Sequence, residues 1–270
     1  MDAGPWRLAL ASAVGTSHLG TGAPCQDSAA HQIIDTPDGP VLVAVVCDGA
    51  GSAAHSDVGS WQAAATFIEL VSLYLENGGQ LSELDRDTAV GWLDEIAEQL
   101  VATAEASGHA VRDYACTLLA AIIGPDAAAF IQIGDGAIVV SHGEEDGWSY
   151  VFWPQHGEFA NTTNFVVSAN AAERLEFELA PRRVDEVALF SDGIENLVLH
   201  NATKTVHEAF FNAMMPPVRR AKTDGLDEEL SKGLERYLSS AAICERTDDD
   251  KTLVLATRAP RPAAPLGDAP

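Results

Sequence analysis

The sequence lacks the features of a secreted, membrane-spanning or metal-thiolate protein. No apolar run approaches the roughly 20 residues of a membrane helix, and no basic segment followed by a long apolar stretch opens the chain. Cysteine is scarce: Cys25, Cys47, Cys116 and Cys244 are widely spaced, and no CxxC pair occurs. This spacing excludes a zinc-thiolate site or a redox pair. We therefore expect reduced thiols in a cytoplasmic protein.

Basic residues are also few. Lys and Arg number 16 against 40 Asp and Glu, which gives a net charge of −24 and a pI near 4.4. Nucleic acids and anionic membranes both select clustered Lys and Arg, so we expect neither as a partner. An acidic surface keeps a protein soluble and accounts for most of the excess. It does not account for aspartates placed directly after apolar strands.

No protein nucleophile is evident. The GxSxG motif of serine hydrolases is absent, and no cysteine begins a Cys-x₅-Arg loop. Gly49-Ala50-Gly51-Ser52 superficially suggests a phosphate loop, but no Lys follows it.

The chain alternates apolar strands with amphipathic stretches along nearly its whole length. With 270 residues and 47% hydrophobic content, we expect one domain over residues 1–258. Residues 259–270 form a Pro/Ala-rich tail that we expect to be disordered. Trp61, Ala64, Ala65, Ile68, Val71 and Leu75 lie at helical spacing, and Asn77-Gly78-Gly79 ends that helix.

The remaining patterns predict many strands joined by tight turns. We expect strands at 5–14, 28–35, 41–47, 115–123, 127–133, 137–141, 148–152, 164–168, 174–179, 185–190 and 251–257. Helices are expected at 86–106, 193–199, 203–214 and 226–241, and a loop at 15–26. Strands joined by tight turns are antiparallel. The prediction is an α+β fold: a four-layer α-β-β-α sandwich of two mostly antiparallel sheets flanked by helices.

Five short acidic segments lie at the ends of these strands. They are Gln26-Asp27, Asp48-Gly49, Gly134-Asp135-Gly136, Ser191-Asp192-Gly193 and Asp248-Asp249-Asp250. Carboxylates at strand ends can converge in space although they are distant in sequence. Converging carboxylates repel one another, and a hard divalent cation such as Mg²⁺ or Mn²⁺ relieves that repulsion. The pattern indicates an oxygen-lined, two-metal hydrolytic centre.

Taken in order, the motifs QD, DGAGS, GDG, SDGI and DDKT resemble the metal-dependent type 2C protein phosphatase (PPM) family. The resemblance covers roughly residues 10–257. It implies a bacterial-type Ser/Thr phosphatase with two Mn²⁺ or Mg²⁺ ions and, in some members, a third. It further implies that a metal-activated bridging water attacks the phosphorus, that phosphorylated Ser/Thr proteins are the substrates, and that a kinase of the same pathway is a partner.

The resemblance assigns roles to the aspartates. Asp48 would bridge both ions, with the Gly49 carbonyl completing one of them, and Asp192 would ligate one ion. Asp-Gly after a strand is also typical of an ordinary turn, and Asp192 is equally suited to cap the helix that follows it.

Two further aspartates are less clearly assigned. Aligning Thr252 with the threonine of the last motif makes Asp249 the ligand and Asp250 its neighbour. Asp135 corresponds to the aspartate that helps hold a third ion, although Gly136 replaces the usual serine. A hairpin turn is the alternative for Asp135.

The first motif departs most from the family. Gln26-Asp27 replaces Glu-Asp, and no Arg lies between Arg7 and Gln26. Asp27 keeps one carboxylate and is expected to bind a metal directly or through water. His18 is the cationic candidate near the missing Arg, either to contact phosphate or to protonate the leaving group; a solvated loop side chain is the alternative.

Asn161, Thr162 and Thr163 correspond in place to the flap beside the family's active site, or form a plain surface loop. Three functions remain open: a phosphoprotein phosphatase, a catalytically weak relative that acts as a binding or signalling module, and a hydrolase of small phosphorylated metabolites.

Overall fold

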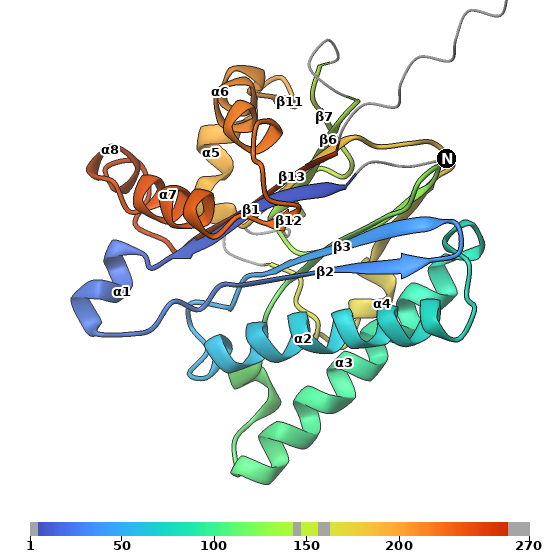
Figure 1. The fold of residues 1–270 in the computed structure, drawn as a ribbon. Coiled ribbons are helices and arrows are strands. Elements are labelled where there is room, and N and C mark those ends of the chain that lie inside the picture. The colour runs from blue at the N-terminus through green and yellow to red at the C-terminus, as the bar shows by residue number, and fades with distance from the viewer. Residues whose placement is uncertain (1–4, 143–146, 156–162, 259–270) are drawn as a thin grey trace, which may run out of the picture.

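Two β-sheets face each other at the centre of the molecule, and helices cover their outer faces (Figure 1). This computed structural model describes residues 5–142, 147–155 and 163–258, so the tail 259–270 lies outside the described residues. The first sheet runs β12 (Gly225–Leu226), β1 (Trp6–Ala13), β13 (Lys251–Arg258), β9 (Glu186–Phe190), β6 (Ala137–Ser141) and β7 (Ser149–Tyr150). The second runs β2 (Ser28–Thr36), β3 (Gly39–Cys47), β4 (Leu118–Ile123), β5 (Ala128–Ile133) and β8 (Glu176–Ala180).

Long helices cover the second sheet and shorter ones the first. The second sheet packs against α2 (Ser56–Glu76) and α3 (Arg86–Ser107). The first packs against α5 (Glu195–Val198), α6 (Glu208–Arg219) and α7 (Glu228–Leu238). The short elements are α1 (Thr16–Thr21), α4 (Ala171–Arg174), α8 (Ala241–Cys244), the 3-10 turns η1 (Leu81–Glu83), η2 (Val111–Tyr114) and η3 (Asp192–Ile194), and the hairpin of β10 (Leu199–His200) with β11 (Thr205–Val206).

Three apolar layers separate the four structural layers. Alternate residues of a strand point to opposite faces of its sheet, and β3 shows this directly. Val43 and Val45 pack toward α2 and α3, whereas Leu42, Ala44 and Val46 pack toward the first sheet. A third layer lies between the first sheet and α5, α6 and α7. The predicted α-β-β-α sandwich is confirmed.

Antiparallel pairing brings distant strand ends to one edge. Ser28 pairs with Cys47, so the residues before β2 and after β3 are neighbours. In the first sheet, Phe190 pairs with both Leu253 and Ala137. The residues after β9, before β13 and before β6 therefore also meet. Each of these junctions carries one of the acidic segments.

Three segments differ from the sequence expectation. The helix expected at 203–214 begins only at Glu208, because residues 199–206 form the β10–β11 hairpin. The predicted loop at 15–26 contains α1, because the Gly15 carbonyl accepts the first helical N–H groups and Gly22 ends the helix with a φ of 74°. The strand expected at 164–168 is absent from the described residues. There the backbone turns instead, with Ser168 N–H donating to the Phe165 carbonyl.

α2 ends at its C-cap Asn77, as predicted, and Ala64, Val71 and Leu75 of the predicted stripe are buried, but part of that stripe is not. Trp61, which contributes to the predicted apolar stripe, is 65% exposed. The buried face includes Gly59, Ser60 and Phe67. Small polar residues are tolerated there because they hydrogen-bond, as Ser60 does with Ser28 of β2.

No helix in the described part of the chain combines the length and the apolar composition needed to cross a bilayer.

Two helix glycines should respond in opposite ways to alanine. A Cβ at Gly59 would lie 2.1 Å from the Tyr114 carbonyl oxygen, whereas nothing lies within 4 Å of one at Gly91. Inside a helix, alanine is favoured over glycine by about 1 kcal/mol. We expect Gly91→Ala to raise the free energy of unfolding by about 0.5–1 kcal/mol in urea denaturation. Gly59→Ala should lower it, and an equal gain for both variants would contradict the close packing.

Candidate metal centre

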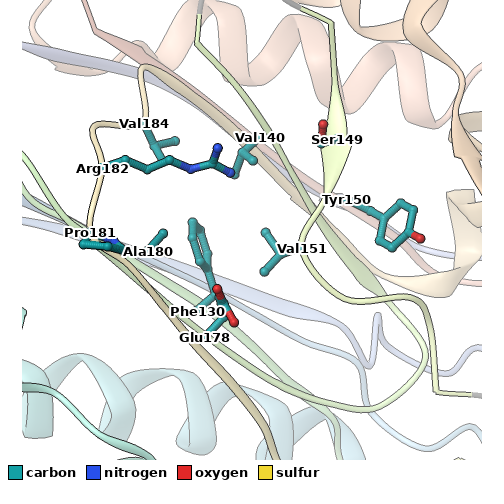
Figure 2. A pocket seen from close by; sticks show the side chains of 10 residues that line it. All are labelled: Phe130, Val140, Ser149, Tyr150, Val151, Glu178, Ala180, Pro181, Arg182 and Val184. Carbon is teal, nitrogen blue, oxygen red and sulfur yellow. The ribbon is translucent and has the colours of Figure 1, made fainter.

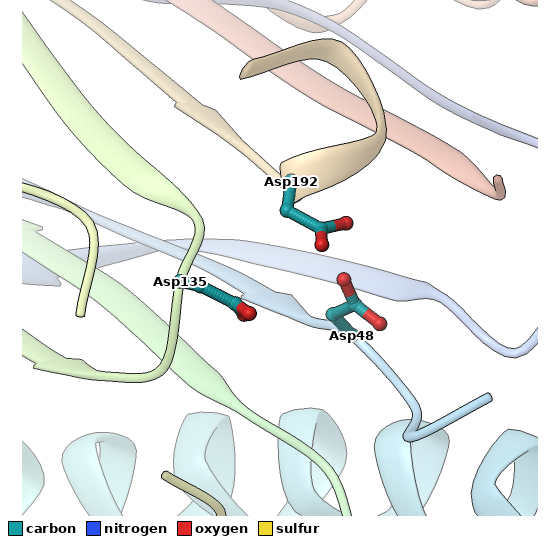
Figure 3. Close-up of side chains that lie close together, drawn as sticks. All are labelled: Asp48, Asp135 and Asp192. Atoms are coloured by element: carbon teal, nitrogen blue, oxygen red, sulfur yellow. The ribbon is translucent and has the colours of Figure 1, made fainter. Parts of the chain in front are cut away.

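Three aspartates converge at the shared edge of the two sheets. Asp48 follows β3, Asp135 precedes β6 and Asp192 opens η3 after β9. One carboxylate oxygen of each lies within 4.8 Å of the other two, and all three side chains are half-buried. Figure 3 shows the carboxylates of Asp48 and Asp192 facing each other with Asp135 alongside.

The backbone around Asp48 is fixed on both sides. Its N–H donates to the Thr117 hydroxyl at 2.9 Å, and its carbonyl accepts the Thr117 N–H at 2.8 Å. A Cβ at Gly49 would lie 2.5 Å from the Gln26 carbonyl oxygen, so glycine is required by close packing. The same Gln26 carbonyl accepts the Gly49 N–H at 3.1 Å.

Asp192 begins the 3-10 turn η3 and does not cap it. Ser191 occupies the position before the turn, so the capping alternative for Asp192 is not realised. The Ser191 hydroxyl donates to Asp27 Oδ2 at 2.6 Å and accepts the Thr252 N–H at 3.0 Å. This chain of contacts links the ends of β9, β13 and β2 across the two sheets.

Asp27 is buried beside this cluster. Burial raises its pKa to about 7, the hydrogen bonds from Ser191 and Thr252 lower it, and the charges of Asp250 and Asp192 raise it. Its Oδ1 is buried, and no other described residue donates to it.

The centre is an uncompensated cluster of negative charge. The pKa of Asp48 is raised well above its usual range, first by burial and then by the charges of Asp27, Asp192 and Asp135. The pKa of Asp192 is raised to about 7 by burial and by the charges of Asp135 and Asp249. In the described part of the chain, the leading causes of these increases are burial and neighbouring carboxylates. Buried acceptor oxygens and mutually repelling carboxylates fit hard divalent cations.

The two neighbouring aspartates before β13 have different environments. Asp250 is buried, accepts the N–H groups of Gly15 at 2.6 Å and Gln26 at 2.5 Å, and lies 3.0 Å from His18 Nδ1. Asp249 is exposed, and its charge acts on Asp192. Asp250 therefore holds the N-terminal loop, whereas the Asp249 side chain is exposed and accepts the Asp250 N–H at 2.8 Å.

Asp135 is held from the flap side. The Thr163 hydroxyl donates to its carboxylate. Asn161 and Thr162 lie outside the described residues. A Cβ at Gly136 would lie 2.5 Å from the Phe190 carbonyl oxygen, so glycine allows β6 and β9 to approach closely here.

Comparison with known proteins identifies the family of the chain. A profile of the family described as "Protein phosphatase 2C" matches residues 14–238. The chain belongs to the protein phosphatase 2C family. It is 40% identical to "Serine/threonine-protein phosphatase 3" of Escherichia coli (strain K12) over 252 residues, which cover 93% of this chain and 98% of that protein.

Solved structures of other phosphatases share the fold. The S. agalactiae serine/threonine phosphatase superposes with a TM-score of 0.62 at 15% identity, over 94% of this chain and all of that one (100%). The catalytic domain of PstP, in complex with manganese ions, gives 0.59 at 15% identity over 94% and 98% of the two chains.

Within the protein phosphatase 2C framework, this chain differs at its first motif. Gln26 is buried, its Nε2 donates to the Ala53 carbonyl at 3.4 Å, and its Oε1 finds no donor in the described ranges. His18 lies on α1 against Asp250. Sequence reasoning gave no role to Thr117 or Ser191, and it placed Thr163 in the flap without its contact to Asp135. The sequence feature that could have pointed to them is a Ser or Thr next to, or facing, an acidic motif.

A separate cavity lies at the other edge of the sandwich. It has a volume of about 340 Å³ and lies between β5, β6, β7, β8 and the loop after β8. Phe130 and Val151 point into it, with Arg182 at its side (Figure 2). None of the predicted metal residues lines it.

The raised pKa values predict a pH-dependent stability of the metal-free protein. A carboxylate with a higher pKa when folded binds protons more tightly in the folded state. Ionisation therefore removes stability as the pH rises from about 4 to about 7. We expect Asp48→Asn, in EDTA, to raise Tm more at about pH 7.5 than at about pH 4.5. The exposed Asp94→Asn is the control, and an equal effect of Asp48→Asn at both pH values would contradict the charge repulsion.

Alanine substitutions at Asp249 and Asp250 should have different effects: one should weaken metal binding, and the other should lower the free energy of unfolding. Asp250→Ala removes buried charged hydrogen bonds and should cost about 3 kcal/mol in urea denaturation. Asp249→Ala should cost under about 0.5 kcal/mol. It should, however, weaken Mn²⁺ binding at least about tenfold in calorimetry. The opposite result, with Asp250→Ala weakening Mn²⁺ binding and Asp249→Ala lowering stability, would make Asp250 the metal ligand and contradict this assignment.

Proposed function

We propose that this protein hydrolyses phosphoserine and phosphothreonine esters in proteins with the help of Mn²⁺ or Mg²⁺. The observation that carries the proposal is the convergence of Asp48, Asp135 and Asp192, whose oxygens lie within 4.8 Å of one another. Membership of the protein phosphatase 2C family and the 40% identity to a serine/threonine-protein phosphatase support it.

The residues present fit a two-ion centre. Those that would hold the ions are Asp27, Asp48, Gly49, Asp192 and Asp249, with Asp135 as the candidate for a third ion. When bound, such ions activate water for in-line attack on phosphorus and neutralise the phosphoryl oxygens. The carboxylates set the charge and position of this centre, and no nucleophilic side chain is needed.

Hydroxyl groups around the carboxylates fix their orientation. Ser191 donates to Asp27, Thr163 donates to Asp135, and Thr117 bonds both the N–H and the carbonyl of Asp48. Groups that orient metal ligands in this way strongly influence metal affinity and activity.

His18 is the residue that we assign to protonation of the leaving oxygen. Its side chain is only 15% exposed, and its Nδ1 lies 3.0 Å from Asp250. A carboxylate partner fixes the orientation of an imidazole ring.

The competing functions are less well supported. A catalytically weak signalling module would have no need to retain the mutually repelling carboxylates, yet all of them are present. A hydrolase of small metabolites would share the chemistry and differ in its preferred substrate. We propose phosphoproteins as substrates, a Ser/Thr kinase acting on the same proteins as the opposing enzyme, and the cytoplasm, where free cysteines persist, as the compartment.

Metal-dependent hydrolysis tests the proposal. The protein should hydrolyse a phosphothreonine peptide with Mn²⁺ and lose this activity in EDTA. Asp192→Ala should lower kcat by at least about a hundredfold because it removes charge at the reacting centre. The exposed Asp94→Ala should leave kcat unchanged. Activity that survives EDTA and Asp192→Ala would refute the proposal, and a higher kcat/KM on small phosphorylated metabolites would favour the metabolite alternative.

A further inference from the structure

Helix α2 presents large apolar side chains to solvent. Val58 is 40% exposed, Trp61 65% and Leu73 48%. Spacings of three and four residues place Val58, Trp61, Ala65, Glu69 and Leu73 along one side of the helix. Gly59, which packs on the Tyr114 carbonyl, marks a different face, because Trp61 lies about 200° further round the helix axis. Tryptophan is mostly buried in folded proteins, so an exposed one near a reaction centre calls for a partner.

The first turns of α2 adjoin the metal centre. The Ser56 carbonyl oxygen lies 2.8 Å from the position of a Cβ on Gly49, directly after Asp48. The Ser60 hydroxyl donates to the Gln26 carbonyl at 2.6 Å, directly before Asp27. Trp61 lies about 8 Å along the helix from Ser56. An extended peptide advances about 3.3 Å per residue, so two or three residues span a distance equal to that from Ser56 to Trp61.

Asp57 and Trp61 form a pair suited to a cationic side chain. They are four residues apart on one helix, which places their side chains side by side. Tryptophan binds Arg and Lys through its ring face, and a nearby carboxylate adds charge attraction. Arg112, in the 3-10 turn against which α2 begins, is paired with Asp113 at 3.9 Å.

The negative charge around the metal centre also favours a partner with basic side chains. The protein carries a net charge of −24. Asp248 and Asp249 are exposed on the other side of the site, beside α1. A phosphorylated segment with acidic neighbours is repelled by such a surface, whereas one with basic neighbours is attracted.

We propose that Asp57 and Trp61 bind an Arg or Lys side chain close to the phosphoresidue, so that the preferred substrates are phosphoproteins with basic residues flanking the phosphorylation site. The inference rests on the proposed function and names its substrate class. Trp61 stacks on the cationic group and Asp57 pairs with it, while the phosphoryl group reaches the carboxylate centre beyond the start of α2.

Matched phosphopeptides test this specificity. Two alanine-based phosphothreonine peptides carry either Arg pairs or Glu pairs on both sides of the phosphothreonine, and kcat/KM is measured with Mn²⁺ at low and high salt. We expect the Arg peptide to be favoured at least about tenfold at low salt, with the ratio falling as salt rises. Trp61→Ala and Asp57→Asn should each lower kcat/KM for the Arg peptide about two- to fivefold.

Two controls isolate the effect. Both variants should retain wild-type turnover of p-nitrophenyl phosphate, which has no flanking residues. Leu73→Ala, an exposed apolar residue about 18 Å along the same helix from Trp61, should leave the peptide preference unchanged. Equal kcat/KM for the two peptides, or a preference that neither Trp61→Ala nor Asp57→Asn diminishes, would overturn the inference while leaving the proposed function intact. Failure to hydrolyse either peptide would instead overturn the proposed function.

Discussion

Repulsion between aspartates at one edge of a β-sandwich is the constraint on which this structure depends. Burial raises the pKa values of Asp27, Asp48 and Asp192, and the charges of neighbouring carboxylates raise them further. A fold tolerates such a cluster only where the surrounding structure fixes it in place. Here the apolar layers on both faces of each sheet supply that rigidity.

Close backbone contacts hold the acidic segments together. A Cβ at Gly193 would lie 1.8 Å from the Asp250 carbonyl oxygen, and one at Gly15 would lie 2.4 Å from that of Asp248. These glycines allow the segment before β13 to pass between η3 and α1. Asp250 then fastens the N-terminal loop through the N–H groups of Gly15 and Gln26. Glycine and aspartate thus act together in these motifs, one by lacking a side chain and the other by accepting hydrogen bonds.

The sequence predicted the sandwich because its strands alternate or run apolar between clear turn signals, and because acidic motifs recur at strand ends. It did not predict α1, since Gly and Thr also favour loops, nor the exposure of Trp61, since helical spacing gives a period but not which side faces the core. The different environments of Asp249 and Asp250 could not be predicted from the sequence either. They depend on a contact between Gly15 and Asp250, which are 235 positions apart. The convergence of Asp48, Asp135 and Asp192 followed from the strand pattern, whereas Ser191 and Thr163 became visible as partners only in three dimensions.

The carboxylates come from both sheets: Asp48 extends β3 of one, and Asp192 follows β9 of the other. Ions bound by carboxylates of both sheets would link the two sheets to each other. Because binding would occur only when the sheets are correctly apposed, ion affinity and folding free energy would be thermodynamically linked. A cavity-forming substitution at Leu42, which is buried between the sheets, would then appear as an altered requirement for divalent cation.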